Sequence, residues 1–488
     1  MEVAKLTEMV ISLQAQVNAL QQLAFNKKSE RSATGQSKKK ANKNNPPHPG
    51  RKPFPPHLER RTVIHDLTEE EKVCKHCQSQ LTKIGEITSE QLELVPAILR
   101  VIKHIRCKYA CKNCHHCLKL APLPAQPFEK SIATASLAAD IISNKYTYHL
   151  PLHRQEKWYG DHGCSIRKST LCGIVMSSAS LLAPIVEAMA KETFSRDHLF
   201  SDDTSTRVFI EIKETGKKKL KKGTLWVITC KESTHSPPCT IYHTYSHSRG
   251  GVIADLLRNG GFTGYLQKDG TSKYNKAKRD CGFIDVGCWG HGRRPYVPIV
   301  RSSKKKGLAH QILRLIDSLY SVEHFCTDQK LSPEERYKVR QEQSKPILKA
   351  IKKLVDENKE KILPKSPLGK AMAYTLNHWD SLNTYLLDGR LEIDNNRSER
   401  ALRGPVLGRK NYLFFGSEEG AEAAEILYSL ADTAKQNNVN FREYLTDVLE
   451  RISTHPNTRI SELLPYNWQK LYSKEALSQQ AASQKLVA

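Results

Sequence analysis

The chain has 488 residues, of which 76 are Lys or Arg and 51 are Asp or Glu, for a net charge of +25. This length suffices for several domains with sizeable cores. The excess of positive charge favours a polyanionic partner through counterion release, with solubility as the alternative explanation, and it decides little about the fold.

Cysteine usage and the opening residues disfavour a secreted protein built on disulfides. The 13 cysteines are an odd number, and several stand in Cys-x-x-Cys pairs. Glu2, Lys5 and Glu8 interrupt the stretch in which a signal peptide would be apolar. Leu181–Met189, the most apolar run, is too short to span a membrane and contains Glu187. We therefore expect a reducing cytoplasm and bound metal.

Residues 1–26 carry a strict heptad pattern. Valine occupies its a positions and leucine its d positions, at Val3, Val10, Val17, Leu6, Leu13 and Leu20. This choice of residues favours a parallel two-stranded coiled coil, so we expect a homodimer. Three heptads are marginal alone, and an amphipathic helix packed on its own chain is the alternative.

Residues 27–62 lose this periodicity and fill with Lys, Asn, Ser and Pro. Lys27–Arg61 contains 11 Lys or Arg and 2 Asp or Glu. With little to bury, the segment is predicted to be a flexible basic linker that touches phosphates without reading sequence. A solvated linker with no partner is the alternative.

Residues 63–127 contain two Cys-x-x-Cys pairs, Cys74 with Cys77 and Cys111 with Cys114. Two such pairs brought together supply the thiolates of a tetrahedral, structural Zn²⁺ site. The metal would contribute folding free energy on the order of 10 kcal/mol or more. The pairs are further apart than in the commonest zinc knuckles, so substitute ligands stay open: Cys107, Cys117, His76, His115 and His116.

Residues 128–195 are predicted to be wholly helical. Leu152–Tyr159 and Arg167–Ser177, joined by a turn near Gly160–Gly163, resemble a DNA-binding helix-turn-helix. Any two helices joined by a glycine turn share this pattern, so packing without DNA is the alternative. The predicted basic face comprises Lys145, His153, Arg154, Lys157, Arg167 and Lys168.

The pattern changes to strands at His198. Alternating or β-branched runs predict three antiparallel strands, then a helix over Val252–Asn259 and two further strands. The strands are expected over residues 198–212, 223–232, 239–247, 264–269 and 283–288, with Gly216–Gly223 as a hairpin loop.

Two aspartates stand out on these strands. Asp202 lies among apolar neighbours in the first strand, where an unpaired carboxylate is costly. Asp269 closes the fourth strand, although a plain turn before Gly270 would also explain it. Beyond Arg301 the chain becomes helical and charged until about Leu387, with Ser332–Gln343 predicted to be mostly solvated.

Leu391–Ser417 then combines acids with cations. Its acids are Glu392, Asp394 and Glu399, and its cations include Arg400, Arg403, Arg409 and Lys410. Such a mixture suits metal ions that face a phosphate backbone. The alternative is an ordinary helix that opens on a capping box, with Asn396 as N-cap and Glu399 three positions on. The remaining chain is predicted to be helical, over 421–435 and 441–452.

Phosphodiester cleavage commonly uses two divalent ions about 3.5–4 Å apart, held by carboxylates from separate elements. Asp202, Asp269 and an acid at the start of a late helix supply such a set for Mg²⁺ or Mn²⁺. Glu399 is the predicted third acid, with Asp394 and Glu392 as rivals. The expected fold class is multidomain α+β.

Several short blocks carry a more specific pattern. They are Phe25–Arg31, the two cysteine pairs, Lys145–Tyr146, Pro151–Glu156, Ser201–Thr204, Leu266–Gly270, Cys288–Arg294, Asp394–Arg403 and Gly408–Tyr412. In this order, and over nearly the whole chain, they resemble the insertion sequence 66 family of bacterial transposases. The blocks from Cys288 onward are the most specific.

The resemblance implies a ribonuclease-H-like catalytic core over residues 196–420, with a helical insertion at about 302–387 and a helical tail over 421–488. It implies Asp202, Asp269 and Glu399 as the metal-binding triad. It further implies double-stranded DNA, both transposon ends and target, as partner of a homo-oligomer near the nucleoid. Other proteins of the same element are further candidate partners.

Cys288 and His291 resemble a Cys-x-x-His element that organises the active site or handles flipped bases in related enzymes. A packed cysteine and a structural histidine are the alternative. Phosphates would be held by Arg293, Arg294, Arg403, Arg409 and Lys410.

The chain departs from the family pattern at two blocks. Asp203-Thr204-Ser205 stands where Glu-Thr-Pro is usual, and Thr271 stands where tyrosine is usual after Asp-Gly. Neither departure removes a triad carboxylate, so we expect activity. Two other functions remain open: a non-enzymatic, zinc-dependent DNA-binding regulator within residues 1–195, and a nuclease that does not join ends.

Overall fold

The computed structural model describes residues 99–103, 108–110, 118–120, 126–128, 131–212, 216–233, 236–245, 251–303 and 305–468. The predicted coiled coil, the basic linker and the four cysteines Cys74, Cys77, Cys111 and Cys114 lie outside them. The chain divides into a unit of residues 26–101 and a unit of residues 1–25 and 102–488, which holds every element named below. There, β1 (Lys108–Ala110) and β2 (Leu118–Leu120) pair antiparallel on either side, in sequence, of the second cysteine pair.

Within the described residues, the main sheet is preceded by three helices: α2 (Ala135–Tyr146), α3 (Leu152–Asp161) and α4 (Lys168–Phe194). The helix predicted over 167–177 is only the beginning of α4, because apolar residues continue at helical spacing for 27 residues. By length and composition α4 could cross a membrane, but core helices of soluble proteins pass the same test. Its buried residues, including Leu182 and Ile185, belong to the larger hydrophobic core.

Lys145 does not lie on the predicted basic face. It is half-buried, and its ammonium lies 4.8 Å from the ring centre of Tyr412, a residue of the late helix α14 (Asn396–Tyr412). Burial lowers the pKa of Lys145 to about 8. The other five residues of that face are exposed.

A five-stranded sheet in the order β5-β4-β3-β6-β7 follows. The first three strands are antiparallel, as predicted. The two later strands, whose direction the sequence did not indicate, run parallel to β3. The strands are β3 (His198–Glu211), β4 (Lys218–Cys230), β5 (Cys239–Tyr245), β6 (Tyr265–Gln267) and β7 (Ile284–Val286). The connections carry α5 (Gly251–Asn259), η1 (Ser272–Tyr274) and α6 (Asn275–Cys281).

The predicted hairpin loop over Gly216–Gly223 is wrong in its second half. Lys218–Lys222 belongs to β4 and extends the ladder with β3 as far as Glu211. The backbone ladder forms here whatever the side chains, and the lysines remain exposed to solvent. Asp269, predicted to close a strand, lies two residues beyond β6.

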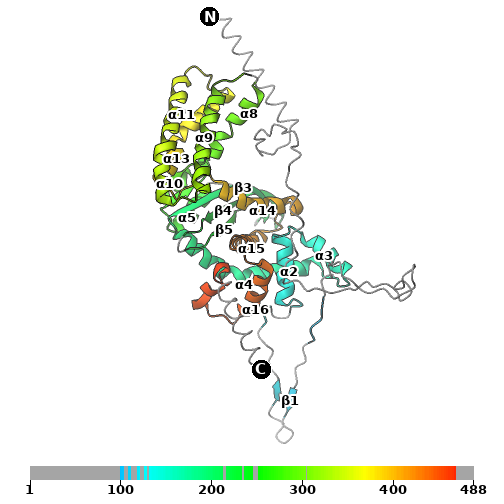
Figure 1. The fold of residues 1–488 in the computed structure, drawn as a ribbon. Helices are drawn as coiled ribbons and strands as arrows, with labels where there is room; N and C mark the ends of the chain where they lie inside the picture. Colours follow the sequence, from blue (N-terminus) through cyan, green and yellow to red (C-terminus); the bar gives the residue numbers. More distant parts are fainter. Residues whose placement is uncertain are drawn as a thin grey trace, which may run out of the picture. The chain divides into compact units, whose positions relative to one another are not determined.

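Helix α15 (Glu418–Gln436) protects the open edge of the sheet at β5 (Figure 1). Three side chains four residues apart on the helix accept hydrogen bonds from alternate backbone N–H groups of the strand. The pairs are Thr433 with Thr240, Ser429 with Tyr242, and Glu425 with Thr244. The two periods match, because four helical residues rise about 6 Å and two strand residues about 6.6 Å. The helix thereby satisfies an edge that could otherwise pair with another chain.

Asp432 on the same helix makes stability depend on pH. Its carboxylate accepts a hydrogen bond from the Tyr242 hydroxyl (3.1 Å), and burial raises the pKa of Asp432 to about 6. The folded chain therefore keeps a proton that the unfolded chain releases above about pH 4, and stability falls as pH rises from about 4 to 6. Asp432→Asn should remove this pH dependence, which lowers the free energy of unfolding of wild type by on the order of 3 kcal/mol. Urea unfolding across these pH values measures it, and an unchanged pH dependence in the variant would contradict it.

The charged region after the sheet is helical, as predicted, and has its own hydrophobic core. Its two long helices, α9 (Leu308–Asp328) and α11 (Lys345–Asn358), lie side by side (Figure 1). This second core also takes in Val286 of β7 and, beyond the helices, Leu391 and Ile393. The elements are α7 (Trp289–Arg293), α8 (Tyr296–Ser302), α9 (Leu308–Asp328), α10 (Pro333–Val339), the π-helical turn η2 (Arg340–Ser344), α11 (Lys345–Asn358), α12 (Pro367–Asn377), α13 (Trp379–Asn383) and η3 (Thr384–Leu387).

Ser332–Gln343 is mostly solvated, as predicted, and α10 buries no residue. Arg340, however, is 0% exposed, because its guanidinium is enclosed by Glu323 and by backbone carbonyl groups. After α14 and α15 the chain ends its described part with α16 (Phe441–Arg451) and η4 (Asn457–Leu463).

Candidate active site

The start of α14 is attached to the first half of β3 through one asparagine. Asn395, which is fully buried, donates from its side chain to the Ser201 carbonyl (2.9 Å), and its own backbone N–H reaches the Cys288 sulfur (3.2 Å). The Trp289 N–H donates to the Ile393 carbonyl (3.0 Å). These bonds fix the entry to α14 between β3 and α7, so the first turn of α14, with Glu399, begins beside the strand that carries Asp202.

A second buried amide attaches the same segment to β6. The Gln267 side chain donates to the Glu392 carbonyl (2.6 Å) and accepts from the Glu392 N–H (3.3 Å), so its amide supplies both a donor and an acceptor to one residue. Because Asp269 follows Gln267 by two residues, the turn with Asp269 is held at the same end of the sheet.

Asp202, Asp269 and Glu399 come together here from three different elements. All three are half-buried. Burial raises the pKa of Asp202 to about 7, and the charges of Asp269, Glu399 and Asp203 add to the rise, against a hydrogen bond from the Asp203 N–H. Ionised carboxylates that repel one another in this way are stabilised by a divalent cation, and hard oxygen ligands suit Mg²⁺ or Mn²⁺.

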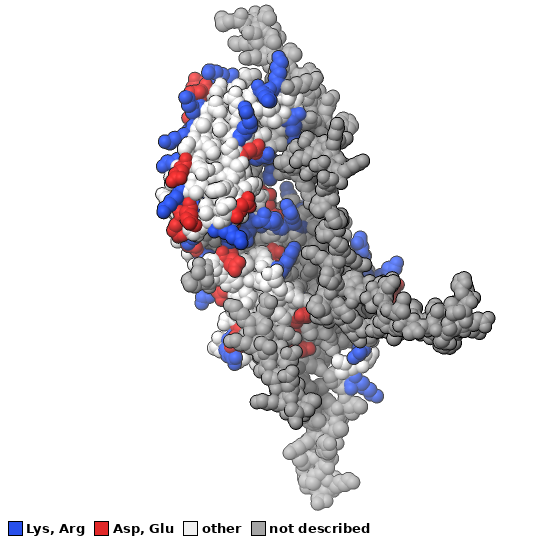
Figure 2. Space-filling view, in the orientation of Figure 1, with Lys and Arg blue, Asp and Glu red and all other residues white. Residues whose placement is uncertain are grey.

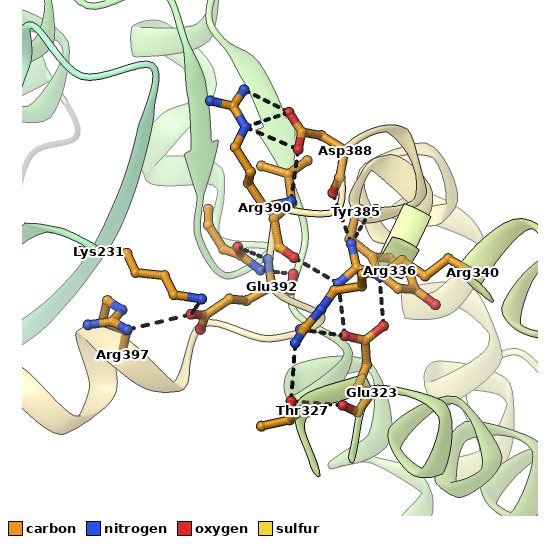
Figure 3. A network of polar contacts seen from close by, with 12 residues as sticks. Lys231, Glu323, Thr327, Arg336, Arg340, Tyr385, Asp388, Arg390, Glu392 and Arg397 are labelled. Carbon is orange, nitrogen blue, oxygen red and sulfur yellow. Dashed lines mark hydrogen bonds and ion pairs between the residues drawn. The ribbon is translucent and has the colours of Figure 1, made fainter. Parts of the chain in front are cut away.

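The rival acids point elsewhere. The buried Asp394 accepts from the Asn396 backbone (3.1 Å) and side chain (2.6 Å), and it bonds the Tyr320 hydroxyl. Glu392 lies between Lys231 (3.4 Å) and Arg397 (3.6 Å), as Figure 3 shows. Each therefore already has its own partners away from Asp202.

The capping-box alternative for Glu399 is wrong. Helix α14 does begin at Asn396 and carries Glu399 in its first turn, but the N-cap residue is Asn395, whose side chain makes no capping bond. The Asn395 side chain is used on β3 instead, and Asp394 satisfies the Asn396 N–H. Glu399 faces other groups: His291 Nδ1 and Arg294 Nη2 each lie 3.6 Å from its Oε1.

The predicted phosphate-holding cations divide into two groups. Arg403 and Lys410 are exposed on α14, and Arg409 donates to the Thr204 hydroxyl (3.3 Å) on β3. Arg293, in contrast, pairs with Asp317 of α9 (2.8 Å). Figure 2 shows Lys and Arg side chains gathered beside a hollow in the middle of one face, with carboxylates among them.

The residues that hold the elements of the candidate active site together were not predicted from the sequence. Ser201, Gln267 and Asn395 are buried polar residues. The Gln267 side chain bonds the backbone of Glu392, 125 positions away, and the Asn395 side chain bonds the Ser201 carbonyl, 194 positions away. Tyr274 is another such residue, since its hydroxyl donates to the Ser201 side chain (3.0 Å). Their only signal in the sequence was position: each stands within seven residues of a predicted carboxylate.

Comparison with known proteins adds an independent observation. Residues 130–423 match the model of the Transposase IS66 family, residues 71–115 that of the zinc-finger binding domain of transposase IS66, and residues 429–466 the IS66 C-terminal element. The chain is 34% identical over 425 residues to the uncharacterized protein y4jD of Sinorhizobium fredii, covering 85% of this chain and 81% of that protein. It is 30% identical to y4hP of the same organism, covering 86% of this chain and 77% of the relative.

Proposed function

Because the chain belongs to the IS66 family of transposases, we propose that it is a DDE-type enzyme that binds the terminal inverted repeats of an insertion sequence, cleaves the DNA and joins the freed ends to target DNA. The observation that carries this proposal is the convergence of Asp202, Asp269 and Glu399 from β3, the turn after β6 and the first turn of α14.

The topology supports a ribonuclease-H-like core within residues 196–420. Three antiparallel strands followed by two strands parallel to the first place Asp202 on the central strand β3 and Asp269 beyond its neighbour β6. The helices between β7 and α14 stand between the second and third acids in sequence, as an insertion over about 302–387 would.

Asp202 and Asp269 would hold the metal ions, with Glu399 completing the set. The ions, when bound, activate the attacking oxygen and stabilise the leaving oxygen of the phosphodiester. The chain itself positions its carboxylates through the buried amides of Gln267 and Asn395. Arg403, Arg409 and Lys410 on α14 are positioned to bind the phosphate backbone of DNA, which contributes affinity without sequence readout.

The proposal also includes the cysteine pairs and the heptads, which lie outside the described residues. The zinc-finger family match spans Cys74, Cys77, Cys111 and Cys114, which we propose bind a structural Zn²⁺. The heptads of residues 1–26 would join two chains, since cleavage at both ends of an element needs two active sites. We propose the bacterial cytoplasm as the place of action.

The test is an assay of the full-length protein on labelled DNA that carries the terminal repeats of its own element, with a target plasmid and Mg²⁺. We expect 3′-end cleavage and covalently joined products, both abolished by EDTA. Cleavage without joined products would assign a nuclease instead. Specific binding of the repeats by residues 1–195 alone, with no cleavage by the full chain in Mg²⁺ or Mn²⁺, would favour a regulator.

A further inference from the structure

A second group of potential metal ligands adjoins the three carboxylates and shares one of them. A Cys288 sulfur, a His291 ring nitrogen and a Glu399 carboxylate oxygen lie within 4.8 Å of one another. Within the described part of the chain, this is the one group of three His, Cys, Asp or Glu residues that comes so close. Asp202, Asp269 and Glu399 do not form a group this close, so in this structure Glu399 is grouped with Cys288 and His291.

The three side chains are held on rigid supports. Cys288 is the N-cap residue of α7, and the N–H groups of His291 and Gly292 both donate to its carbonyl (3.1 Å each). Glu399 is fixed by the attachment of Asn395 to β3. Cys288 and His291 are one helical turn apart, a spacing at which two side chains can reach the same ion.

The Cys288 sulfur is buried and accepts a hydrogen bond. Cys288 is only 2% exposed and forms no disulfide, and the Asn395 N–H points at its sulfur from 3.2 Å. N–H donors of this kind orient and stabilise metal ligands from the second shell.

We propose that Cys288, His291 and Glu399 form a binding site for a Zn²⁺-type ion, separate from the zinc module of the N-terminal region. Thiolate, imidazole and carboxylate together select Zn²⁺, Co²⁺ or Cd²⁺ over Mg²⁺, which prefers oxygen ligands. Three protein ligands leave a fourth tetrahedral position to water. The ion would take the place of the Arg294 guanidinium, 3.6 Å away, as the counter-charge of Glu399.

The site has a consequence that rests on the proposed function. Glu399 cannot serve a Zn²⁺ ion beside Cys288 and a Mg²⁺ ion beside Asp202 in the same position. Occupation of the Cys288 site therefore withdraws the third acid from catalysis, and Zn²⁺ becomes an inhibitor of the Mg²⁺-dependent reaction.

The first test measures zinc content and needs no DNA. Full-length wild type, Cys288→Ser, His291→Asn and the control Cys326→Ser are equilibrated with Zn²⁺, dialysed and analysed for metal per chain. Cys326 is also a buried free cysteine, but it lies on α9. We expect one ion fewer per chain in the first two variants and the wild-type content in the control. His291 is partly exposed, so His291→Asn keeps the test valid if Cys288→Ser fails to fold.

Equal zinc content in all four proteins would overturn the site. A second test titrates Zn²⁺ into the Mg²⁺-dependent cleavage reaction, each protein being compared with its own zinc-free rate. We expect Zn²⁺ to inhibit wild type at least about tenfold at a concentration that leaves the rate of Cys288→Ser unchanged. Equal inhibition of the two proteins would overturn the link to Glu399. If no protein cleaves DNA, the transposase proposal fails while the zinc content still decides the site.

Discussion

Replacing Asp202 or Asp269 by asparagine is expected to lower Mg²⁺-dependent cleavage of terminal-repeat DNA by about 10³-fold or more. An asparagine amide cannot supply the negative charge that holds a divalent ion against a phosphate, and the chemistry depends on that ion. The effect should appear in the cleavage rate at saturating Mg²⁺ and saturating DNA, because binding of the DNA backbone falls to other residues, such as the cations of α14.

The stability of Asp202→Asn shows whether a loss of cleavage comes from a lost metal ligand or from a damaged fold. Burial and the charges of Asp269 and Glu399 disfavour the ionised Asp202 carboxylate, with its pKa raised to about 7. In EDTA near neutral pH, Asp202→Asn should therefore unfold at the same urea concentration as wild type or a higher one. A variant that is inactive and also less stable would contradict this account of Asp202.

Neighbouring acids provide matched controls for the same assay. Asp203 follows Asp202 directly but is paired with Lys273, so Asp203→Asn should cleave within a few-fold of wild type. For the third acid, Glu399→Gln should lose cleavage, whereas Glu392→Gln should retain it because Glu392 lies with Lys231 and Arg397. Equal cleavage by the Asp202 and Asp269 variants and wild type would end the assignment of the triad.

The sequence predicted those elements whose cause is local. The antiparallel strands β3, β4 and β5 follow from alternating and β-branched runs. Asp202 was predicted to have a functional role because an unpaired carboxylate inside an apolar strand is costly. The helical character of the region up to Leu387 and the start of α14 at Asn396 also follow from local pattern.

The assembly of the site could not be predicted in this way, because it depends on distant partners. Asn395 has the composition of a helix cap, yet its side chain bonds Ser201, 194 residues away, and the capping box does not form. Gln267 could equally have been an exposed strand residue, but it pairs with the backbone of Glu392, 125 residues away. A polar side chain can bond either to the backbone beside it or to a residue far away in the chain, and only the first possibility can be read from the sequence.

Arg340 is the clearest case of a residue whose role depends on distant partners. Its replacement by methionine is expected to cost about 3–5 kcal/mol of local stability. All five N–H donors of its guanidinium are used (Figure 3). Two of them bind the Glu323 carboxylate (2.8 Å each), and three bind the backbone carbonyls of Tyr385, Asp388 and Leu391 (2.7–2.9 Å). Methionine would leave these acceptors buried without their donors.

The loss should be seen as faster amide hydrogen exchange over residues 385–395, by about 100-fold or more. Arg390→Met is the matched control, since Arg390 contacts the same segment through Asp388 but is half-exposed, and exposed ion pairs are worth less than about 1 kcal/mol. A double variant, Glu323→Met with Arg340→Met, should recover part of the stability, because it removes the buried carboxylate that the single change leaves with Arg336 alone.

The same change should reach the acidic triad. The segment that Arg340 binds continues directly into Glu392 and Asn395, the two residues that attach the entry of α14 to β6 and β3. Loosening it displaces Glu399 without touching any carboxylate, so cleavage should fall in Arg340→Met while Arg390→Met remains near wild type. Normal cleavage in an Arg340→Met protein with fast exchange over 385–395 would show that Glu399 is positioned without the segment that Arg340 binds.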